Sequence, residues 1–332
     1  MSPEPKVLQF NDCAFVARSM VSAARRAGLE WDYLPPELVR PMTAAPHNAL
    51  LAKARFVPFV ARRMLRLRQA DIVHVHYGTS VRLIKERAMP QRPYVLTLHG
   101  TDIRKQWKDP QFHGEIQRAV DGAAHVFYAN TDNEADATSA RPDAEYLPSL
   151  VDAARLPRWQ PAGRPQVMFI SRWDDDKGVG RQLSLAGELA KALAGKADLV
   201  GLNWGPGAVQ AEALGVRLLE KMPQEAYQQQ LGRSVVGIGQ ASDYFSTSEF
   251  EALCMGLPVA ALGTRLPRPD DGTTPPVMEG EVFEVVQQVV DAVSDPLAAS
   301  ARLAGRDWAL PRYSADNYVP RLQELYRRVA VG

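Results

Sequence analysis

Short apolar runs alternate along the chain with segments whose apolar residues recur at helical spacing. The first run, residues 7–10, is followed by a turn at 11–13 and by a helical pattern that ends near Gly28. This strand–turn–helix order predicts the opening of a doubly wound α/β domain. Further strands, with the turns that follow them, are expected at 71–78, 94–102, 125–130, 166–172, 197–207, 234–239 and 259–262.

The second half of the chain ends in helical patterns at 284–293, 298–308 and 313–331. Residues 155–165 hold several prolines and predict a domain boundary. Residues 263–281 are rich in proline and glycine, and we expect a mobile loop there.

The stretch from Gly239 to Leu262 predicts a loop, a short helix and a buried strand. Ser248 and Glu251 have the spacing of a capping box, so a helix is expected to start near Ser248. Gly256, followed by a proline, should end it. The amino end of such a helix, beside several Ser and Thr residues, is a natural anion site.

Composition sets limits on function. The chain has 332 residues and a net charge of +1, which favours two domains and argues against a nucleic-acid binder. Two distant cysteines predict neither a disulfide framework nor a cysteine metal site. The amino-terminal residues do not resemble a signal peptide, and no apolar run approaches the ~18 residues of a membrane span. We therefore expect a cytoplasmic protein.

Residues 41–70 contain six Lys or Arg residues and no acid, and the basic segment 53–68 includes all six. After Pro58 the apolar residues predict an amphipathic helix. One interpretation is attraction to an anionic acceptor or to the inner membrane face, which would make the protein peripheral there. The favoured interpretation is a crossover helix with a solvated basic face.

Polar residues stand at the ends of two expected strands. His74, His76 and Tyr77 end the first, and His99 ends the second, ahead of Arg104. In open α/β sheets, ligands bind beyond these carboxyl ends. No Asp or Cys follows His74 and His76 at the spacing of metal ligands, so zinc is not expected. One of these two histidines is expected to lie in the core. The acids at 174–176 are interpreted as solvated helix-starting charges rather than a metal site.

The run from Glu251 to Val259, with Asp243 eight positions upstream, resembles the E-x7-E signature of retaining GT-B glycosyltransferases, and most closely glycosyltransferase family 4. Asp243 replaces the first glutamate of that signature. Segments 98–102, 145–152, 171–178, 203–207 and 222–227 are also similar to family segments, in the same order. The paired glycines usual after the first strand are absent near Asn11, and Ser171 replaces another glycine.

This resemblance implies a GT-B fold, in which two Rossmann-like doubly wound domains face each other across a cleft. It places an acceptor-side domain at 1–158, a nucleotide-sugar donor domain at 159–312, and a C-terminal helix at 313–332 that crosses back onto the first domain.

The resemblance also implies a reaction. A hexosyltransferase-like enzyme would move a sugar from a nucleotide-diphosphate-sugar to an acceptor hydroxyl with retention of configuration and without a metal or other cofactor. The acceptor would be a small molecule, a glycan or a lipid-linked acceptor. Arg and Lys suit the departing diphosphate, because one offers a planar fork and the other a compact charge. The alternatives are a non-catalytic sugar-nucleotide-binding protein, a nucleotide-sugar epimerase on the same fold and, less favoured, a metal-dependent GT-A enzyme.

By resemblance, the residues fall into three groups. The expected catalytic residues are His99, Asp243, Arg172 and Lys177. The expected donor-binding residues are Arg172, Lys177, Ser248, Glu251, Asp243 and Met222. The expected acceptor-side residues are Asn11, Asp12, His76, Tyr77 and Arg104.

Overall fold

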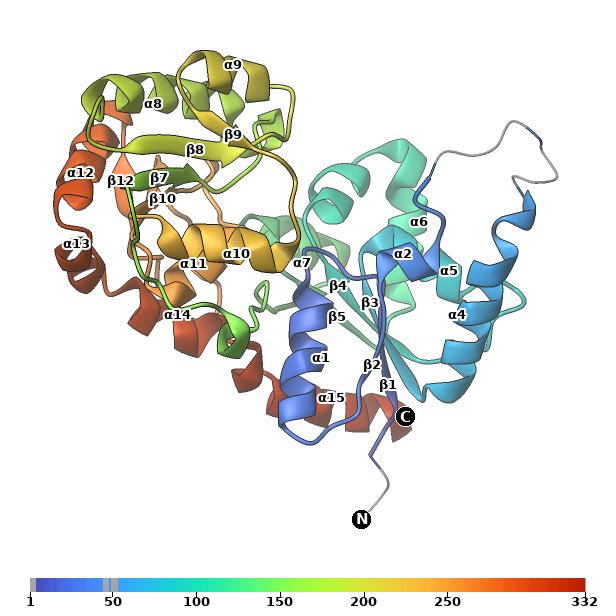
Figure 1. The fold of residues 1–332 in the computed structure, drawn as a ribbon. Coiled ribbons are helices and arrows are strands. Elements are labelled where there is room, and N and C mark those ends of the chain that lie inside the picture. The colour runs from blue at the N-terminus through green and yellow to red at the C-terminus, as the bar shows by residue number, and fades with distance from the viewer. Residues whose placement is uncertain (1–3, 44–47, 49–52, 332) are drawn as a thin grey trace. The chain divides into compact units, whose positions relative to one another are not determined.

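The computed structural model describes residues 4–43, 48 and 53–331. The chain forms two compact units (Figure 1): unit 1 is Met1–Asp152 with Ala315–Gly332, and unit 2 is Ala153–Ser314. The sequence placed the first boundary six residues later. The difference arises because the proline-rich segment packs on unit 2, where the Trp159 indole donates to the Ser234 carbonyl at 2.8 Å.

Unit 1 is built on a parallel sheet with strand order β2-β1-β3-β4-β5-β6. Its strands are β1 (Val7–Phe10), β2 (Asp32–Leu34), β3 (Ile72–His76), β4 (Tyr94–Leu98), β5 (His125–Tyr128) and β6 (Glu145–Tyr146). The order reverses between β1 and β3, so the carboxyl ends of these two strands flank the point where such sheets bind ligands.

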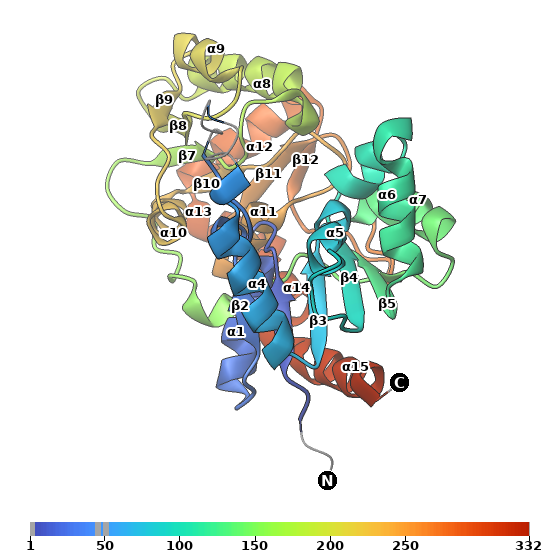
Figure 2. The same ribbon diagram turned by 90° about the vertical axis from the view of Figure 1, so that its right-hand side faces the viewer.

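Helices cover both faces of this sheet. They are α1 (Val16–Arg26), α2 (Pro36–Val39), α4 (Val57–Gln69), α5 (Val81–Ile84), α6 (Pro110–Asp121), α7 (Glu134–Ala140) and α15 (Val319–Val331). Side chains of α1 and α15 share one core cluster, while those of α4, α5, α6 and α7 share the other. Figure 2 shows α4 and α5 beside β3.

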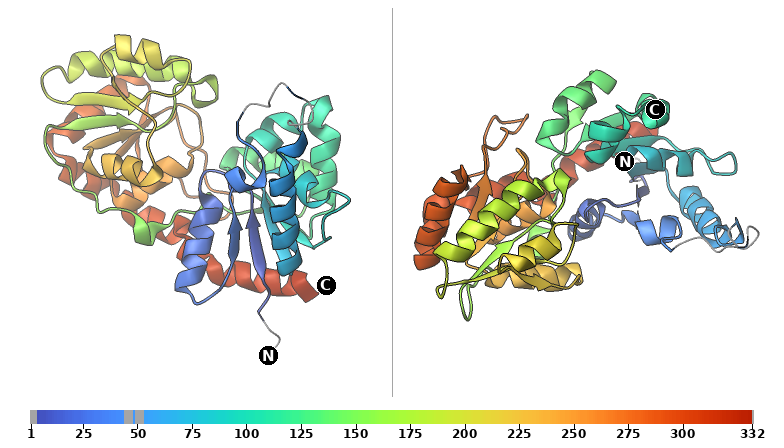
Figure 3. Two further views of the ribbon diagram at one scale, coloured as in Figure 1. Left: turned by 45° about the vertical axis from the view of Figure 1, so that its right-hand side comes forward. Right: turned by 90° about the horizontal axis from the view of Figure 1, so that it is seen from above.

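The last helix, α15, completes the core of unit 1. Leu322 and Tyr326 are fully buried in one cluster with Val7 of β1 and Ile72 of β3. Figure 3 shows α15 running under the strands of this unit. The structure thus returns the end of the chain to the first unit.

Unit 2 has a parallel sheet with strand order β12-β11-β10-β7-β8-β9. Its strands are β7 (Gln166–Phe169), β8 (Asp198–Leu202), β9 (Arg217–Leu219), β10 (Val236–Ile238), β11 (Val259–Leu262) and β12 (Met278–Gly280). Counted within the unit, this is the Rossmann order 6-5-4-1-2-3, and its switch point lies between β7 and β10.

The helices of unit 2 also occupy both faces of its sheet. They are α8 (Val179–Ala192), α9 (Ala208–Ala213), α10 (Gln224–Arg233), α11 (Thr247–Met255), α12 (Val282–Ser294), α13 (Pro296–Leu303) and α14 (Gly305–Tyr313). Figure 1 shows α8 and α12 on one face and α10 and α11 on the other. Both units are therefore Rossmann-like, as the GT-B prediction required.

The basic segment 53–68 forms most of α4, and part of its charge is paired. Arg63 is buried and pairs with Glu86 at 3.0 Å, and Arg66 pairs with Asp32 at 2.9 Å. Residues 44–47 and 49–52 of the acid-free stretch lie outside the described residues. No helix in the described part of the chain is long and apolar enough to cross a membrane. Contact of this segment with a membrane stays a prediction, which co-sedimentation with anionic vesicles would test.

Candidate functional site

Lys177 lies at the switch point of unit 2, between the segments that follow β7 and β10. Its ammonium donates to Gln240 Oε1 at 2.5 Å and to Ser246 Oγ at 2.7 Å, and it lies 5.4 Å from the centroid of the Tyr244 ring. The carbonyl of Lys177 accepts from the N–H of Ala241 at 3.0 Å. A fixed cation therefore stands where α11 begins.

Helix α11 starts at Thr247, one residue before Ser248, but its N-cap is Ser246 rather than Ser248. The capping box is formed by Ser246 and Glu249: the Ser246 side chain accepts from the backbone N–H at position N3, and Glu249 accepts from the Ser246 N–H at 3.1 Å. The expected pair, Ser248 and Glu251, is therefore wrong as a capping box. The helix ends at Gly256, whose φ of 95° is left-handed, as predicted.

This cap gives a stability prediction. Ser246→Ala should lower the free energy of unfolding by about 1 kcal/mol, because a donor at the start of α11 loses its partner. Ser246→Asn should lose less, since asparagine is also a favourable N-cap. Urea unfolding followed by circular dichroism measures both variants. Equal losses in the two variants would contradict a capping role for this side chain.

Glu251 is free of the capping role and lies buried among polar side chains. Its Oε1 accepts from the amides of Gln224 at 2.9 Å and Gln228 at 2.8 Å, both on α10. Burial raises the pKa of Glu251 to about 7. Ser248 hydrogen-bonds Tyr227, which also lies on α10. The Tyr227 hydroxyl donates to the carbonyl of Ile170 at the end of β7. Glu251 is thereby tied to the strand that leads to Arg172.

Arg172 extends from the end of β7 toward an aromatic side chain. It pairs with Asp174, and its guanidinium carbon lies 5.7 Å from the centroid of the Trp204 ring. The ammonium of Lys221 lies 5.0 Å from the same ring, and Trp204 is 47% exposed. Met222, half-buried, follows Lys221. The sequence interpretation missed Trp204, although an exposed tryptophan in a glycine-rich turn after a strand was a usable signal.

The segment that carries Asp243 is fixed by hydrogen bonds from a buried arginine. Arg265, 2% exposed, donates to the backbone carbonyls of Gln240, Ser242 and Leu262. Asp243 itself is exposed. The expected loop at 263–281 contains Arg265 and β12 and is therefore anchored in the unit. A buried arginine inside a proline- and glycine-rich stretch gave no distinct sequence signal.

In unit 1, two of the expected acceptor-side residues build the turn after β1. The Asn11 amide donates to the His76 carbonyl at 3.1 Å and to Ser80 Oγ at 2.7 Å. Asp12 accepts from the N–H groups that start α1 and from the Tyr33 hydroxyl at 2.8 Å, and burial raises its pKa to about 6. Asn11 has a φ of 57°, so this turn takes a left-handed conformation without glycine.

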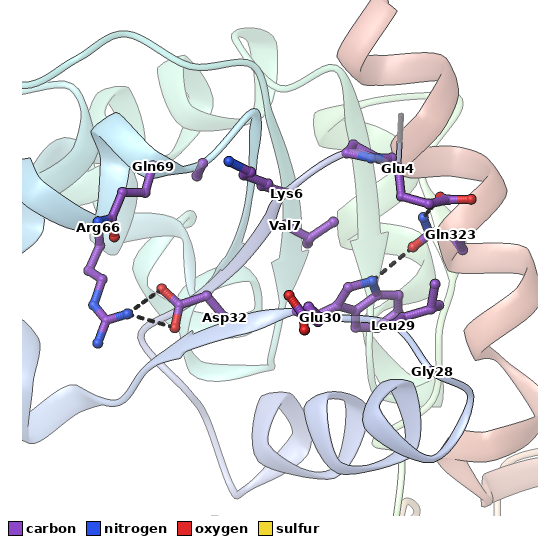
Figure 4. A pocket seen from close by; sticks show the side chains of 13 residues that line it. Glu4, Lys6, Val7, Gly28, Leu29, Glu30, Asp32, Arg66, Gln69 and Gln323 are labelled. Atoms are coloured by element: carbon purple, nitrogen blue, oxygen red, sulfur yellow. Dashed lines mark hydrogen bonds and ion pairs between the residues drawn. The ribbon is translucent and has the colours of Figure 1, made fainter. Parts of the chain in front are cut away.

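A cavity of about 410 Å³ lies beyond the carboxyl ends of β1 and β2. It is lined by Asp12, Ala14, Phe15, Arg18, Tyr33, Pro36 and Glu37. Another cavity, of about 430 Å³, lies at the opposite edge of the same sheet, where β1 and β2 begin (Figure 4). Only the first is at the edge where open α/β sheets bind ligands, so it is the candidate acceptor cavity.

His76 is not available for contact with an acceptor, which corrects the sequence prediction. The side chains of His74 and His76 are both fully buried and stack with centroids 4.5 Å apart, so both are core histidines. The Nδ1 atom of His76 lies 3.0 Å from Nε2 of His99. Period-two spacing put both histidines on one face of β3, and that face is covered by α15.

His99 is partly exposed and is held in a sharp turn after β4. The buried carboxylate of Asp102 accepts from the backbone N–H groups of Gly78, His99, Gly100 and Ile103 at 2.9–3.0 Å. Gly100 has a φ of 119°, which other residues rarely adopt.

The other two expected acceptor-side residues differ in what they contact. Tyr77 is half-buried at the end of β3. The Arg104 Nε donates to Asp132 Oδ2 at 2.6 Å, so its charge is partly neutralised within unit 1. Within the described ranges, no group of three or more His, Cys, Asp or Glu side chains is placed to hold a metal ion.

Comparisons with known proteins bear on the fold and on the family resemblance. Residues 14–148 match the family model of the glycosyl transferase 4-like domain. No curated protein matches the chain in sequence. Among solved structures, a sucrose-phosphate synthase from Thermosynechococcus elongatus aligns with a TM-score of 0.70 at 15% identity over 98% of this chain and 99% of its own.

Two further structures have similar coverage. HepE from Anabaena, solved in complex with UDP and glucose, aligns with a TM-score of 0.64 at 12% identity, over 97% of this chain and 99% of its own. AviGT4, a glycosyltransferase of avilamycin A biosynthesis, aligns with a TM-score of 0.61 at 19% identity, over 99% of each chain. The GT-B fold and the resemblance to glycosyltransferases are thereby confirmed.

Proposed function

Because residues 14–148 match the model of the glycosyl transferase 4-like domain, we propose that the chain transfers a sugar from a nucleotide-diphosphate-sugar to an acceptor hydroxyl. The transfer retains the anomeric configuration and needs no metal. The observation that carries the proposal is the position of Lys177, fixed by Gln240 and Ser246 at the switch point of unit 2. A prearranged cation there suits a departing diphosphate.

The expected donor-binding residues of unit 2 each have a role in this proposal. Arg172 and Lys177 bind the diphosphate oxygens, with the N-terminus of α11 adding N–H groups and a favourable dipole. Glu251 accepts hydrogen bonds from the ribose hydroxyls, next to Ser248. Asp243, which is exposed, accepts from hydroxyls of the transferred sugar. Met222 contributes apolar contact beside the base.

Unit 1 supplies the acceptor side and His99. The cavity beside Asp12 combines Phe15 and Tyr33 with charged side chains, which suits a sugar-containing acceptor such as a glycan. With retention, the acceptor attacks on the face that the diphosphate leaves, and the leaving phosphate takes the acceptor proton. Two cations stabilise the charge that develops there. Because HepE was solved with UDP and glucose, UDP-sugars are the first donors to test.

Binding and transfer are tested in turn. In a thermal-shift panel of nucleotide sugars, the cognate donor at 100 times its Kd should add about 2.7 kcal/mol of stability. That donor should then label a glycan acceptor at the same rate with and without EDTA, and NMR of the product should show the anomeric configuration of the donor. Donor affinity without turnover would favour a non-catalytic binder, and conversion of donor alone an epimerase. Loss of activity in EDTA would contradict the metal-free reaction.

A further inference from the structure

A continuous chain of hydrogen bonds runs through the core of unit 1 and ends at His99. Its members come from β1, β3, the β4 segment and α15, and are Thr97, His74, Tyr326, Gln9, His76 and His99. The hydrogen-bond distances between consecutive members, in that order, are 2.7, 2.6, 3.0, 2.9 and 3.0 Å. Side chains separated by more than 300 residues in sequence are thus joined in one row.

The three imidazoles in this row are neutral. Burial lowers the pKa of His74 to about 3 and that of His99 to about 4, and it lowers the pKa of His76 well below its ordinary value. A neutral imidazole carries one ring N–H and one bare nitrogen. Each of the two inner rings, His74 and His76, therefore donates one hydrogen bond of the row and accepts the other.

The orientation of the Gln9 side-chain amide determines which partner donates and which accepts in every hydrogen bond of the row; we call this the direction of the row. Its Nε2 donates to the Tyr326 hydroxyl, and its Oε1 faces Nε2 of His76, which must therefore carry the proton. Nδ1 of His76 is then an acceptor, so its partner, Nε2 of His99, must be the donor. A half-turn of the Gln9 amide would reverse every one of these bonds.

The consequence appears at the outer end of the row. With its proton on Nε2, His99 presents a bare Nδ1, and among the described residues no group hydrogen-bonds that atom. His99 is partly exposed at the carboxyl edge of the sheet. An unoccupied acceptor at this edge suits a ligand hydroxyl, and sugars and their acceptors are rich in hydroxyl groups.

We propose that Gln9, His76 and Tyr326 are positioning residues that hold His99 in the Nε2–H tautomer, so that its Nδ1 accepts a hydrogen bond from a substrate hydroxyl. The assignment of the hydroxyl to a sugar substrate rests on the proposed function. The direction of the row rests on the orientation of the Gln9 side-chain amide.

Within the row, the Tyr326 side chain is itself fixed by Trp31. The Trp31 ring packs edge-on against Tyr326, with centroids 5.1 Å apart, and its Nε1 donates to Gln323 Oε1 at 2.8 Å. Figure 4 shows this hydrogen bond to Gln323 at the wall of the cavity at the amino ends of β1 and β2. Trp31 thus ties Tyr326 and Gln323, both on α15, to the segment just before β2.

The tautomers can be read directly by NMR of the imidazole nitrogens in the full-length protein. We expect His74, His76 and His99 all to carry the proton on Nε2. In Gln9→Met, His76 loses its acceptor, and His99 should show a mixture of tautomers. Leu8→Met, one residue earlier on β1 and buried on the other face, should leave the tautomers unchanged. A proton on Nδ1 of His99 in the unsubstituted protein would overturn the proposal.

Kinetics test the consequence for substrate. In His99→Asn, the amide oxygen takes the place of Nδ1, whereas in His99→Gln the amide nitrogen takes the place of Nε2. We expect kcat/KM of His99→Asn to exceed that of His99→Gln by roughly tenfold, about the effect of one hydrogen bond. The reverse order would contradict the Nδ1 acceptor. If no nucleotide sugar is turned over at all, the proposed function fails, while the NMR result still decides the direction of the row.

Discussion

Lys177→Ala is expected to lower kcat for sugar transfer by roughly 10²–10³-fold, the effect of removing one preorganised group that stabilises developing charge. The ammonium of Lys177 is already held by Gln240 and Ser246, so it does not have to reorganise when the diphosphate leaves. Because charge on the leaving group grows during the reaction, kcat should fall more than donor affinity. Steady-state kinetics with the cognate donor, together with its dissociation constant, measure both effects.

Lys191→Ala is the matched control for Lys177→Ala. Lys191 is an exposed lysine on α8, and among the described residues its ammonium pairs only with Glu188, one turn away. This variant should keep kcat within about twofold, since exposed ion pairs contribute little. Unfolding curves for both variants separate a loss of catalysis from a loss of fold. A Lys177→Ala enzyme with nearly normal kcat would remove this residue from the reaction.

Glu251 should make donor binding depend on pH near neutrality. Burial raises the pKa of Glu251 to about 7 in the free protein. In the proposed function, ribose hydroxyls donate to its ionised form. Donor binding therefore favours loss of the proton, and affinity should rise as pH increases through 7. If only the carboxylate binds, affinity at pH 8 should be roughly tenfold higher than at pH 6. Calorimetry with UDP over this range measures the dependence.

Glu251→Gln should remove that dependence and weaken binding. A hydrogen bond to a charged group contributes about 1.5–3 kcal/mol, so affinity at pH 8 should fall at least tenfold. Glu225→Gln, at an exposed position on the neighbouring helix α10, should keep the unsubstituted profile. A pH profile in Glu251→Gln equal to that of the unsubstituted protein would assign the titration to another group.

The strands were predictable because a parallel sheet buries both faces, which makes each strand a short apolar run. The ends of these runs also located the candidate residues, since β7 leads to Arg172 and β10 to the segment before α11. The start of α11 was not predictable to the residue. Both Ser246 with Glu249 and Ser248 with Glu251 fit the capping pattern. In the pair that forms, Ser246 also hydrogen-bonds Lys177 and Gln240, which lie outside the helix.

The burial of His76 was equally unpredictable from the local sequence. Its position at the end of β3 suggested exposure, yet both ring nitrogens are bonded in the core, one to Gln9 and the other to His99. The stacked neighbour His74 is held by Tyr326, 252 residues away. A buried polar side chain of this kind is stable only when its partners arrive, and no local pattern announces partners so far apart.

The division of the chain has a consequence for synthesis. Unit 2 is one continuous segment, whereas unit 1 needs both its amino-terminal part and Ala315–Gly332. On the ribosome, unit 2 can reach its native state while unit 1 still lacks α15, although unit 1 emerges first. Until α15 has been synthesised, the face of β1 and β3 that receives Leu322 and Tyr326 stays uncovered and open to chaperones. The strands of unit 1 are thus made before unit 2, yet their core is completed after it.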